Sequence, residues 1–497
     1  MILRQSKILA FSIPLLFFAI YIQTFFSDYA YLDEVHQLWH NNDNSNFRMF
    51  HTQGRWLSGL LFQKFFSSIS TIEQLKLLRW FSLCGWIITT LIWAAIFRKW
   101  IALLNLSPRL WLPGVFYFVC SISVCIYIGW ASCMEIFLGV LLALLSGHIC
   151  FRLLLVHQNK FRWPIAMSSL ALGVASLFIY QPSFGIFLVP FFLQYVRARK
   201  ARPGTTIVIG IIFYIVVYLV YYLLFRYSLK AYDLEAANRT GITFNVIKKV
   251  GFFFSGPFPQ GFSLNLLFLA RSIVSQIFYV LVFIAWLAIT FKLNAQHRLR
   301  ENLLFILAIL LLLALIYLPV MIAAENFPSY RTLFAFNLAV FLMVSESVLQ
   351  FVNTEAQQKL IAAVVIVWLL LTGIYTFNLQ FINPLKKEYT ILRRFVQRHY
   401  KPGITTVYFI RADKFLFNQQ FHTNVYRDEF GAPSTYRDWV PEPIMKQLIF
   451  EITGNRTTAE NLSVIQFENA ELYERAKLRA NQSTLFIDMN KIFRAAE

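Results

Sequence analysis

Apolar runs of about twenty residues recur along most of the chain, and they limit the folds it can adopt. A helix needs about 20 apolar residues to cross the hydrocarbon core of a bilayer. We find about eleven such runs and expect an α-helical polytopic membrane protein. The runs lie near residues 8–26, 78–97, 110–128, 134–155, 163–180, 183–196, 205–225, 264–291, 302–323, 331–350 and 360–381. The sixth is short and flanked by proline, so we expect it to be broken or tilted.

The composition agrees with this fold class. Of the 497 residues, 58% are hydrophobic and 14% are charged, whereas soluble domains carry about 25% charged residues. In a membrane protein a net charge of +20 is a signal of topology. We therefore expect no nucleic-acid partner. None of the five cysteines has metal-ligand spacing, and no disulfide framework is implied.

Basic residues gather in alternate loops, as the positive-inside rule predicts. With the N-terminus inside, the short outside loops near 129–135 and 180–183 carry no Lys or Arg. The outside loop near 325–331 carries only Arg331. Most acidic residues before the C-terminal tail fall outside. The chemistry is therefore expected on the outer face, and an odd number of spans places the tail there too.

The composition changes near Asn383 to that of a mixed soluble segment, so two domains are expected. Residues 1–382 form the transmembrane domain, and residues 383–497 form a small C-terminal α/β soluble domain on the periplasmic side. In the tail the patterns predict strands at Thr405–Arg411, Leu462–Phe467 and Thr484–Met489, and helices at Glu442–Glu451 and Ala470–Ala480.

Besides the outer turn near 180–183, the outer loops expected in the transmembrane domain are 27–77, 129–134, 226–263 and 324–330. Within the first, Gly54–Ser67 is amphipathic and too short to span, which is typical of a helix lying along the membrane surface. The third is long enough to act as a mobile lid.

Two adjacent acids, Asp33 and Glu34, follow the first predicted span. A partly desolvated carboxylate at a membrane surface suits a general base that removes a proton from an attacking hydroxyl. The alternative is a solvated loop acid or a helix cap. His36 and His40 would share a face with Asp33 on a helix and offer a divalent-metal site. We favour interfacial histidines over that site.

Three arginines are candidates for binding a phosphate, because guanidinium matches phosphate geometry bidentately. Arg55 lies in Gln53–Leu57 and is otherwise a snorkelling side chain of an amphipathic helix. Arg331 opens a span on the outer side, and its alternative partner is Glu325. Arg271 lies within a predicted span, where an unpaired charge is costly.

The outer turns also offer side chains that suit a sugar. Glu135 enters a span, where an acid needs a partner or a polar cavity. Tyr180 and Gln181 place an amide beside an aromatic ring, although Pro182 also fits an ordinary turn. Glu325 and Tyr330, in the turn that carries Arg331, are further candidates.

Together these motifs resemble a membrane glycosyltransferase of the GT-C type, and more narrowly the bacterial GtrII-like glucosyltransferases that modify O-antigen. The resemblance covers roughly residues 1–380. It rests on four short motifs in a common order and on a common side: Asp33-Glu34, Gln53–Leu57, Tyr180–Pro182 and Pro328–Arg331.

This resemblance implies a GT-C-like fold and a role for each motif. Asp33 would be the catalytic base, with Glu34 as its neighbour or alternate. Arg55 and Arg331 would hold the donor phosphate. Gln181 and Glu135 would contact sugar.

We therefore expect an inverting glycosyltransferase of the bacterial inner membrane, with its active site on the periplasmic face. It would move a hexose, glucose by the resemblance, from a polyprenyl-phosphate donor such as undecaprenyl phosphate to O-antigen or its lipid-linked precursor. No cofactor is expected and a divalent metal is not favoured. Its partners would be membrane lipid, the lipid-linked donor and the glycan acceptor, with a donor synthase and a flippase acting beside it.

The main rival is a transporter or flippase of a lipid-linked glycan. Transporters place ionisable groups near the bilayer midplane, often with repeated halves and broken helices. Glu346 and Arg271 are the residues that such a protein would use. The absence of a visible repeat and the gathering of acids in outer loops favour the enzyme. A third alternative is a non-catalytic assembly protein whose tail binds a partner.

Overall fold

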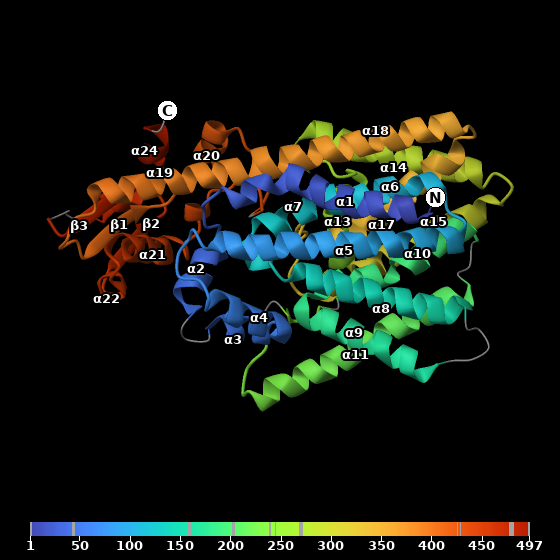
Figure 1. The fold of residues 1–497 in the computed structure, drawn as a ribbon, viewed down its shortest axis with the longest axis horizontal. Coiled ribbons are helices and arrows are strands. Elements are labelled where there is room, and N and C mark those ends of the chain that lie inside the picture. The colour runs from blue at the N-terminus through green and yellow to red at the C-terminus, as the bar shows by residue number, and fades with distance from the viewer. Residues whose placement is uncertain are drawn as a thin grey trace.

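Long helices lie side by side in a bundle, with a small β-sheet at one end, in the computed structural model (Figure 1). We call these the sheet end and the opposite end. The structure describes residues 2–41, 45–156, 162–200, 204–237, 240–243, 245–267, 272–424, 426–427, 429–476 and 482–495, with side chains from Ser12 onward except that of Val156.

Eight helical segments in this part of the chain are long and apolar enough to cross a membrane. They are Leu75–Leu104, Pro108–Gly129, Ala131–Leu155, Thr205–Ala231, Ile273–Leu293, Leu299–Ile316, Phe334–Phe351 and Glu355–His399. Each coincides with a predicted span. The chain is therefore built for several passes through a bilayer, as its composition predicts.

The other three predicted spans correspond to helices outside this set of eight. α1 (Ile2–Tyr21) continues into η1 (Ile22–Phe25), and α9 covers Trp163–Ile179. The predicted sixth span is broken, because a 3-10 segment, η5 (Gln181–Leu188), precedes α10 (Val189–Ala198).

Within the eight long segments the structure resolves individual helices. They are α5 (Leu75–Leu104), η3 (Pro108–Leu110), α6 (Trp111–Cys120), α7 (Ile122–Gly129), η4 (Ala131–Cys133), α8 (Ile136–Val156), α11 (Thr205–Ala231), α14 (Ile273–Leu293), α15 (Leu299–Ile316), α17 (Phe334–Phe351) and α18 (Glu355–Ile374). Large apolar side chains such as Trp86, Trp93 and Phe118 fill the interior of the bundle and pack its helices together.

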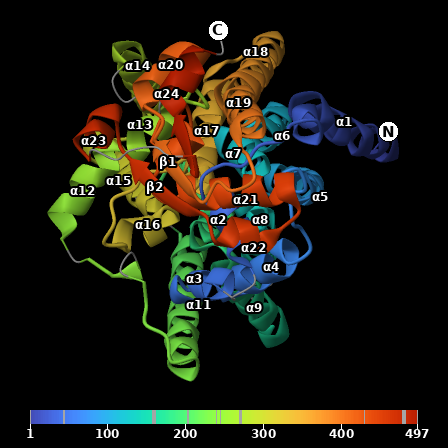
Figure 2. The ribbon, with the colours of Figure 1, turned by 90° about the vertical axis from the view of Figure 1, so that its left-hand side faces the viewer.

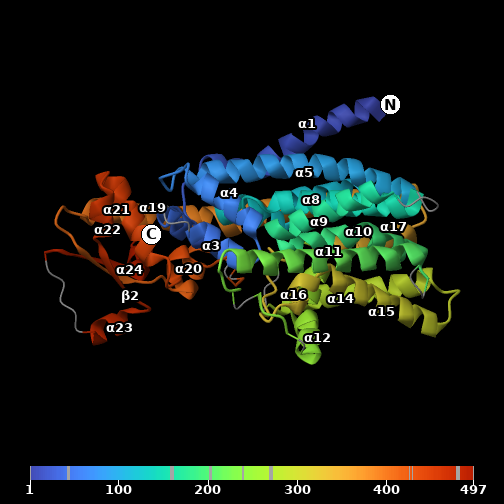
Figure 3. The same cartoon turned by 90° about the horizontal axis from the view of Figure 1, so that it is seen from below.

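Short helices cover the sheet end of the bundle. α2 (Asp33–Trp39), α3 (Ser45–Thr52) and α4 (Trp56–Phe66) follow the first helix, and α4 lies within the predicted helix Gly54–Ser67. The predicted third loop holds the end of α11, then α12 (Val246–Ser255) and α13 (Pro257–Phe262). Figure 3 shows α12 at the edge of the bundle, beside α16 (Leu318–Ile322).

The C-terminal sheet has three parallel strands in the order β2-β1-β3. Thr406 of β1 (Thr406–Ile410) pairs with Ser463 of β2 (Ser463–Phe467) and Thr484 of β3 (Thr484–Asp488). Parallel neighbours need long crossovers. The helices around the sheet are α20 (Lys414–Phe421), η8 (Ser434–Tyr436), α21 (Pro441–Thr453), α22 (Arg456–Glu460), α23 (Ala470–Arg475) and α24 (Met489–Arg494). All three strands lie at their predicted positions.

One continuous helical run, Glu355–His399, joins the bundle to the sheet (Figure 1). α18 passes through a π-helical segment, η7 (Tyr375–Ile382), into α19 (Asn383–His399). The predicted domain boundary at residues 382 and 383 therefore falls inside a helix.

The sheet region also packs on the surface helices, as Figure 2 shows from the sheet end. The Ile72 N–H donates to Glu451 Oε1 at 2.7 Å. Arg456 Nη2 donates to the carbonyl of Trp39 at 2.9 Å. Buried apolar residues form one cluster that runs from the bundle into the sheet region. The C-terminal segment is thus attached to the bundle through a helix, hydrogen bonds and a shared core.

Candidate functional site

Glu34 is fully buried and forms an ion pair with the equally buried Arg79 of α5, with Nη2 and Oε2 2.6 Å apart. The backbone N–H groups of Tyr31 and Ala131 also donate to this carboxylate. Arg79 donates to the carbonyls of Tyr29 and Gly129 as well. Burying two charges is tolerated when further hydrogen bonds support the pair. Here both oxygens of Glu34 are bonded, whereas Arg79 Nη1 is buried without a hydrogen-bond partner among the described residues. This pair therefore ties the first loop to α5.

Asp33 differs from its neighbour because its side chain is partly exposed. It occupies the first residue of α2, directly after Leu32, whose φ of 45° is in the left-handed region. Asp33 also interacts favourably with the positive charge of Arg331. Of the two adjacent acids, Asp33 is thus the one that solvent and a substrate can reach.

Arg331 is held at the sheet end by Glu429, a residue of the C-terminal segment. Its Nε donates to Glu429 Oε1 at 3.1 Å, and its guanidinium lies 4.3 Å from the centre of the Trp130 ring. Burial lowers the pKa of Arg331, but Glu429 together with Cys133, Tyr180 and Asp33 raises it by more, so the net shift is upward. Arg331 stays cationic, and a quarter of its side chain is exposed.

Arg55 forms a second ion pair, with Glu135. Arg55 Nη2 lies 2.7 Å from Glu135 Oε1, and Arg55 Nε donates to the carbonyl of Ile179 at 3.0 Å. Ser58 Oγ donates to the same oxygen of Glu135. The other oxygen, Oε2, is buried and has no hydrogen-bond partner among the described residues. Glu135 therefore has the partner that an acid entering a span needs, and one acceptor to spare.

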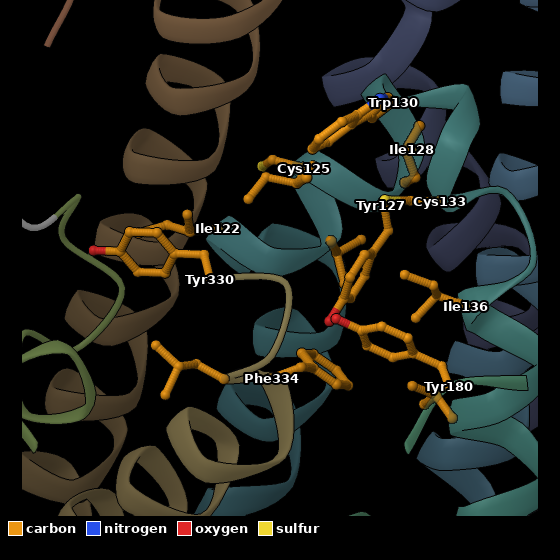
Figure 4. Close-up of a cluster of buried hydrophobic side chains, with 14 of the residues drawn as sticks. Ile122, Cys125, Tyr127, Ile128, Trp130, Cys133, Ile136, Tyr180, Tyr330 and Phe334 are labelled. Carbon is orange, nitrogen blue, oxygen red and sulfur yellow. The ribbon is translucent and has the colours of Figure 1, made fainter. Parts of the chain in front are cut away.

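Tyr180 connects the two arginines. The guanidinium of Arg55 lies 4.9 Å from the centre of its ring, and both arginines interact electrostatically with its hydroxyl. Burial raises the pKa of Tyr180, and the two arginines oppose that shift. Figure 4 shows Tyr180 and Tyr127 with their hydroxyl ends turned toward each other, and the Tyr127 hydroxyl donates to the carbonyl of Arg331.

Gln181 braces the turn between α3 and α4. Its Nε2 donates to the carbonyl of Gln53 at 2.9 Å and to the Tyr221 hydroxyl at 2.8 Å. That hydroxyl in turn donates to the carbonyl of Gly54 at 3.0 Å. Gly54 has a φ of +73°, and an added Cβ would lie 2.2 Å from the Tyr221 oxygen. These contacts hold the turn that presents Arg55, so Gln181 also has a structural role.

The remaining candidates are placed differently. Glu325 is exposed, and the cation bound at its turn is Lys249, which donates to the side chain of Asn326. Tyr330 is buried, with its ring 4.7 Å from that of Tyr426. Arg271 lies outside the described residues. The structure therefore brings together Asp33, Arg55, Glu135, Tyr180, Gln181 and Arg331, but leaves Glu325 at the surface.

His36 and His40 share a face of α2, with ring centres 4.5 Å apart. In the described part of the chain, no group of three or more His, Cys, Asp or Glu side chains is arranged to hold a metal ion. The two histidines thus pack against each other at the surface of the first loop.

Two residues of this region were missed by sequence reasoning. Arg79 lies just inside a predicted span on its outer side, and that breach of the positive-inside bias was a usable signal. Glu429 lies in a tail segment without a recognised motif. Its partner Arg331 is 98 residues away, so no local pattern marks it.

A separate polar cluster lies near the opposite end. The buried carboxylate of Glu346 accepts from the Ser107 N–H and from Gln350, which also binds Arg199. A cavity of about 10 Å³ lies between the side chains of Glu346, Gln350 and Arg199. Glu346 is thus near the end of α17, within five residues of Phe351.

Comparisons with protein-family models, with curated proteins and with solved structures found no match to this chain. Its function must therefore be argued from its own residues.

Proposed function

We propose that this protein is an inverting membrane glycosyltransferase that moves a hexose from a polyprenyl-phosphate donor to a glycan acceptor. The observation that carries the proposal is the relation between Asp33 and the two arginines. An accessible carboxylate lies in the field of Arg331, and Tyr180 joins Arg331 to Arg55. A base beside a pair of phosphate-binding cations is what transfer from a sugar phosphate requires.

In the proposed reaction Asp33 takes the proton of an acceptor hydroxyl as its oxygen attacks the anomeric carbon. The bond between that carbon and the phosphate oxygen breaks, and the lipid phosphate leaves with the electron pair. Arg331 and Arg55 stabilise the developing phosphate charge. Attack opposite the leaving group inverts the anomeric centre. Asp33 is preferred to Glu34 because Glu34 is buried and engaged with Arg79.

Sugar binding is assigned to groups around this centre. Glu135 Oε2 offers a buried acceptor for a hydroxyl. Tyr180 supplies an aromatic surface between the two arginines. The hexose is proposed to be glucose and the acceptor to be O-antigen or its lipid-linked precursor, on the basis of the resemblance alone.

The proposed topology has eleven spans in the bacterial inner membrane, formed by the eight long helical segments, α1, α9 and the η5–α10 pair. The N-terminus would be inside, with the site and the C-terminal segment on the periplasmic face. The distribution of Lys and Arg supports this orientation. A reporter fused to the C-terminus tests it, and cytoplasmic activity of the reporter would contradict it.

The test of function is transfer by the purified protein in liposomes. Labelled polyprenyl-phosphate glucose and O-antigen acceptor are supplied on the face that carries the C-terminal segment. We expect labelled glycan and released polyprenyl phosphate in equal amounts. No transfer to this acceptor, with a folded protein and either orientation, would contradict the proposal.

A transporter of lipid-linked glycan is the second candidate, favoured by the buried Glu346 beside Arg199. The cavity between these side chains is only large enough for about one water molecule. The position of Glu346 near one end of α17, and not at the middle, makes it a weaker transport site. The same liposomes distinguish the two functions. Movement of an intact lipid-linked glycan between leaflets, without sugar transfer, would favour the transporter.

A further inference from the structure

The C-terminal segment touches both sides of the candidate site. Residues 429–435 contact the turn that carries Arg331 and, five residues later, the backbone that precedes Asp33. These two parts of the site come from the turn before α17 and from the first loop, about 300 residues apart in the chain. A third element that binds both can fix the distance between them.

At one end of this segment, Glu429 organises the turn at residues 329–331. Its carboxylate is fully buried and accepts from the Ser329 hydroxyl, from the backbone N–H of Tyr330 at 2.7 Å and from that of Arg331 at 3.1 Å. The Arg331 Nε donates to it as well, at 3.1 Å. One tail residue thus sets both the backbone and the side chain of Arg331.

At the other end, Ser434 holds the start of α2. The Leu32 N–H donates to Ser434 Oγ at 2.6 Å, and Ser434 Oγ donates to the carbonyl of Ala30 at 3.2 Å. Leu32 has the left-handed backbone described above, which persists only when its surroundings fix it. Because Leu32 directly precedes Asp33, this contact fixes the position of the Asp33 backbone from which the carboxylate extends.

The segment is itself anchored to the long helix. Glu388 of α19 is buried and accepts from the backbone N–H groups of Ser434 at 2.7 Å and Thr435 at 3.0 Å. The Thr435 hydroxyl donates to it at 2.7 Å. Since α19 continues from α18, its contacts fix the position of residues 429–435 relative to the bundle.

We propose that residues 429–435 are a positioning clamp, in which Glu429 sets Arg331 and Ser434 sets Asp33 for the same reaction. This inference rests on the proposed function. By this inference, the C-terminal segment positions two residues of the candidate site. Neither residue touches substrate, so both act through the groups that they hold.

The test uses three variants of the full chain in liposomes. Glu429→Gln replaces one of the two carboxylate oxygens with an NH₂ donor, so either the Tyr330 N–H or Arg331 loses its acceptor. Ser434→Ala removes the acceptor for the Leu32 N–H. Glu451→Gln is the matched control, because Glu451 also joins the tail to the bundle, through Ile72, but lies outside the clamp.

We expect different kinetic effects from the two clamp variants. Glu429→Gln should raise the KM for the lipid-linked donor by roughly tenfold and also lower kcat, since Arg331 both holds the donor phosphate and stabilises the charge that develops on it. Ser434→Ala should lower kcat by roughly 10- to 100-fold with little change in that KM, since Asp33 is displaced. Glu451→Gln should leave both constants unchanged.

Amide hydrogen exchange gives a readout that does not need activity. Exchange should become faster in the peptide covering 328–332 in Glu429→Gln and in the peptide covering 30–34 in Ser434→Ala, but in neither peptide for Glu451→Gln. Faster exchange with wild-type kinetics, or unchanged exchange in both peptides, would overturn the clamp. If the wild type transfers no sugar, the proposed function fails, while the exchange result still tests whether one segment holds both peptides.

Discussion

Glu135 uses one carboxylate oxygen for Arg55, 2.7 Å away, and keeps the other buried without a hydrogen-bond partner among the described residues. A buried ion pair is tolerated best when every lone pair is satisfied. An unused acceptor next to a paired one is costly in a structural salt bridge. It is useful in a binding site, where a ligand hydroxyl completes the set.

Glu135→Gln should separate these two roles. Glutamine keeps an oxygen for Arg55 and Ser58 but replaces the spare acceptor with an NH₂ group. We expect roughly tenfold slower sugar transfer, from the loss of about one hydrogen bond to a charged group. The melting temperature should fall only moderately, because Arg55 loses the charge of its partner but keeps the hydrogen bond to the retained oxygen. Transfer assays and thermal unfolding in detergent measure both. Wild-type transfer by this variant would remove Glu135 from the site.

Asp33→Asn should abolish catalysis without unfolding the protein. General-base catalysis contributes about 10²- to 10⁴-fold, so kcat should fall by at least about 100-fold. Asp33 is partly exposed, and asparagine is also tolerated at a helix start. The matched control is Glu73→Gln, an exposed acid of the same loop. If Asp33→Asn restores wild-type glycan to a deletion strain, Asp33 is not the base.

Arg79→Ala should destabilise the protein strongly, because it leaves Glu34 buried and unpaired. Removing one partner of a buried pair costs about 3–5 kcal/mol. The control is Arg475→Ala, which breaks a pair whose side chains are 71% and 68% exposed; its effect should be below about 0.5 kcal/mol. Denaturation in detergent measures both. Equal effects from the two variants would mean that the Glu34–Arg79 pair is not structural.

Gly54→Ala should displace the turn that carries Arg55. The added Cβ meets the Tyr221 oxygen and the positive φ is unfavourable for alanine, so we expect a loss of about 1–3 kcal/mol. Gly251→Ala is the control, since nothing lies within 4 Å of its Cβ and its backbone is helical. Adding Tyr221→Phe should recover part of the stability of Gly54→Ala by removing the clashing oxygen. No recovery would assign the whole effect to the backbone.

The stability of the protein should fall as the pH drops below about 6.5, in part through His51. Burial lowers the pKa of His51 below its ordinary value. The unfolded chain then takes up a proton before the folded protein does, so the contribution is lost as pH falls, by at most about 1.4 kcal/mol per pH unit. His51→Gln should show a smaller drop in melting temperature between about pH 7.5 and 5.5 than the wild type. The exposed His399→Gln should match the wild type; the reverse pattern would contradict this assignment.

Local patterns predicted the features that depend on local sequence. The eight long helices follow from runs of apolar residues, and β1 to β3 follow from short β-rich segments bounded by turns. The domain boundary near Asn383 stays a prediction. The composition does change near Asn383, but the backbone stays helical through it because η7 and α19 continue α18.

The candidate site could be predicted only in part. Asp33 and Glu34 are equivalent in the sequence, and what separates them is Arg79, 45 residues beyond Glu34. Arg331 was expected to pair with Glu325 or with phosphate, whereas the structure pairs it with Glu429. Each of these assignments depends on contacts between distant segments. Loop charge can mark Arg79 as unusual, but neither loop charge nor hydropathy identifies the partner of either arginine.

The unbroken helix from Glu355 to His399 fixes how the C-terminal segment is rotated about the helix axis relative to the bundle. Each residue of an α-helix adds about 100° of rotation and about 1.5 Å of rise. A single insertion near η7 would therefore swing residues 429–435 around the helix axis and away from both Asp33 and Arg331. Surface loops tolerate insertions and deletions of any length. In this helix, only insertions or deletions close to a whole number of turns would keep residues 429–435 facing the site.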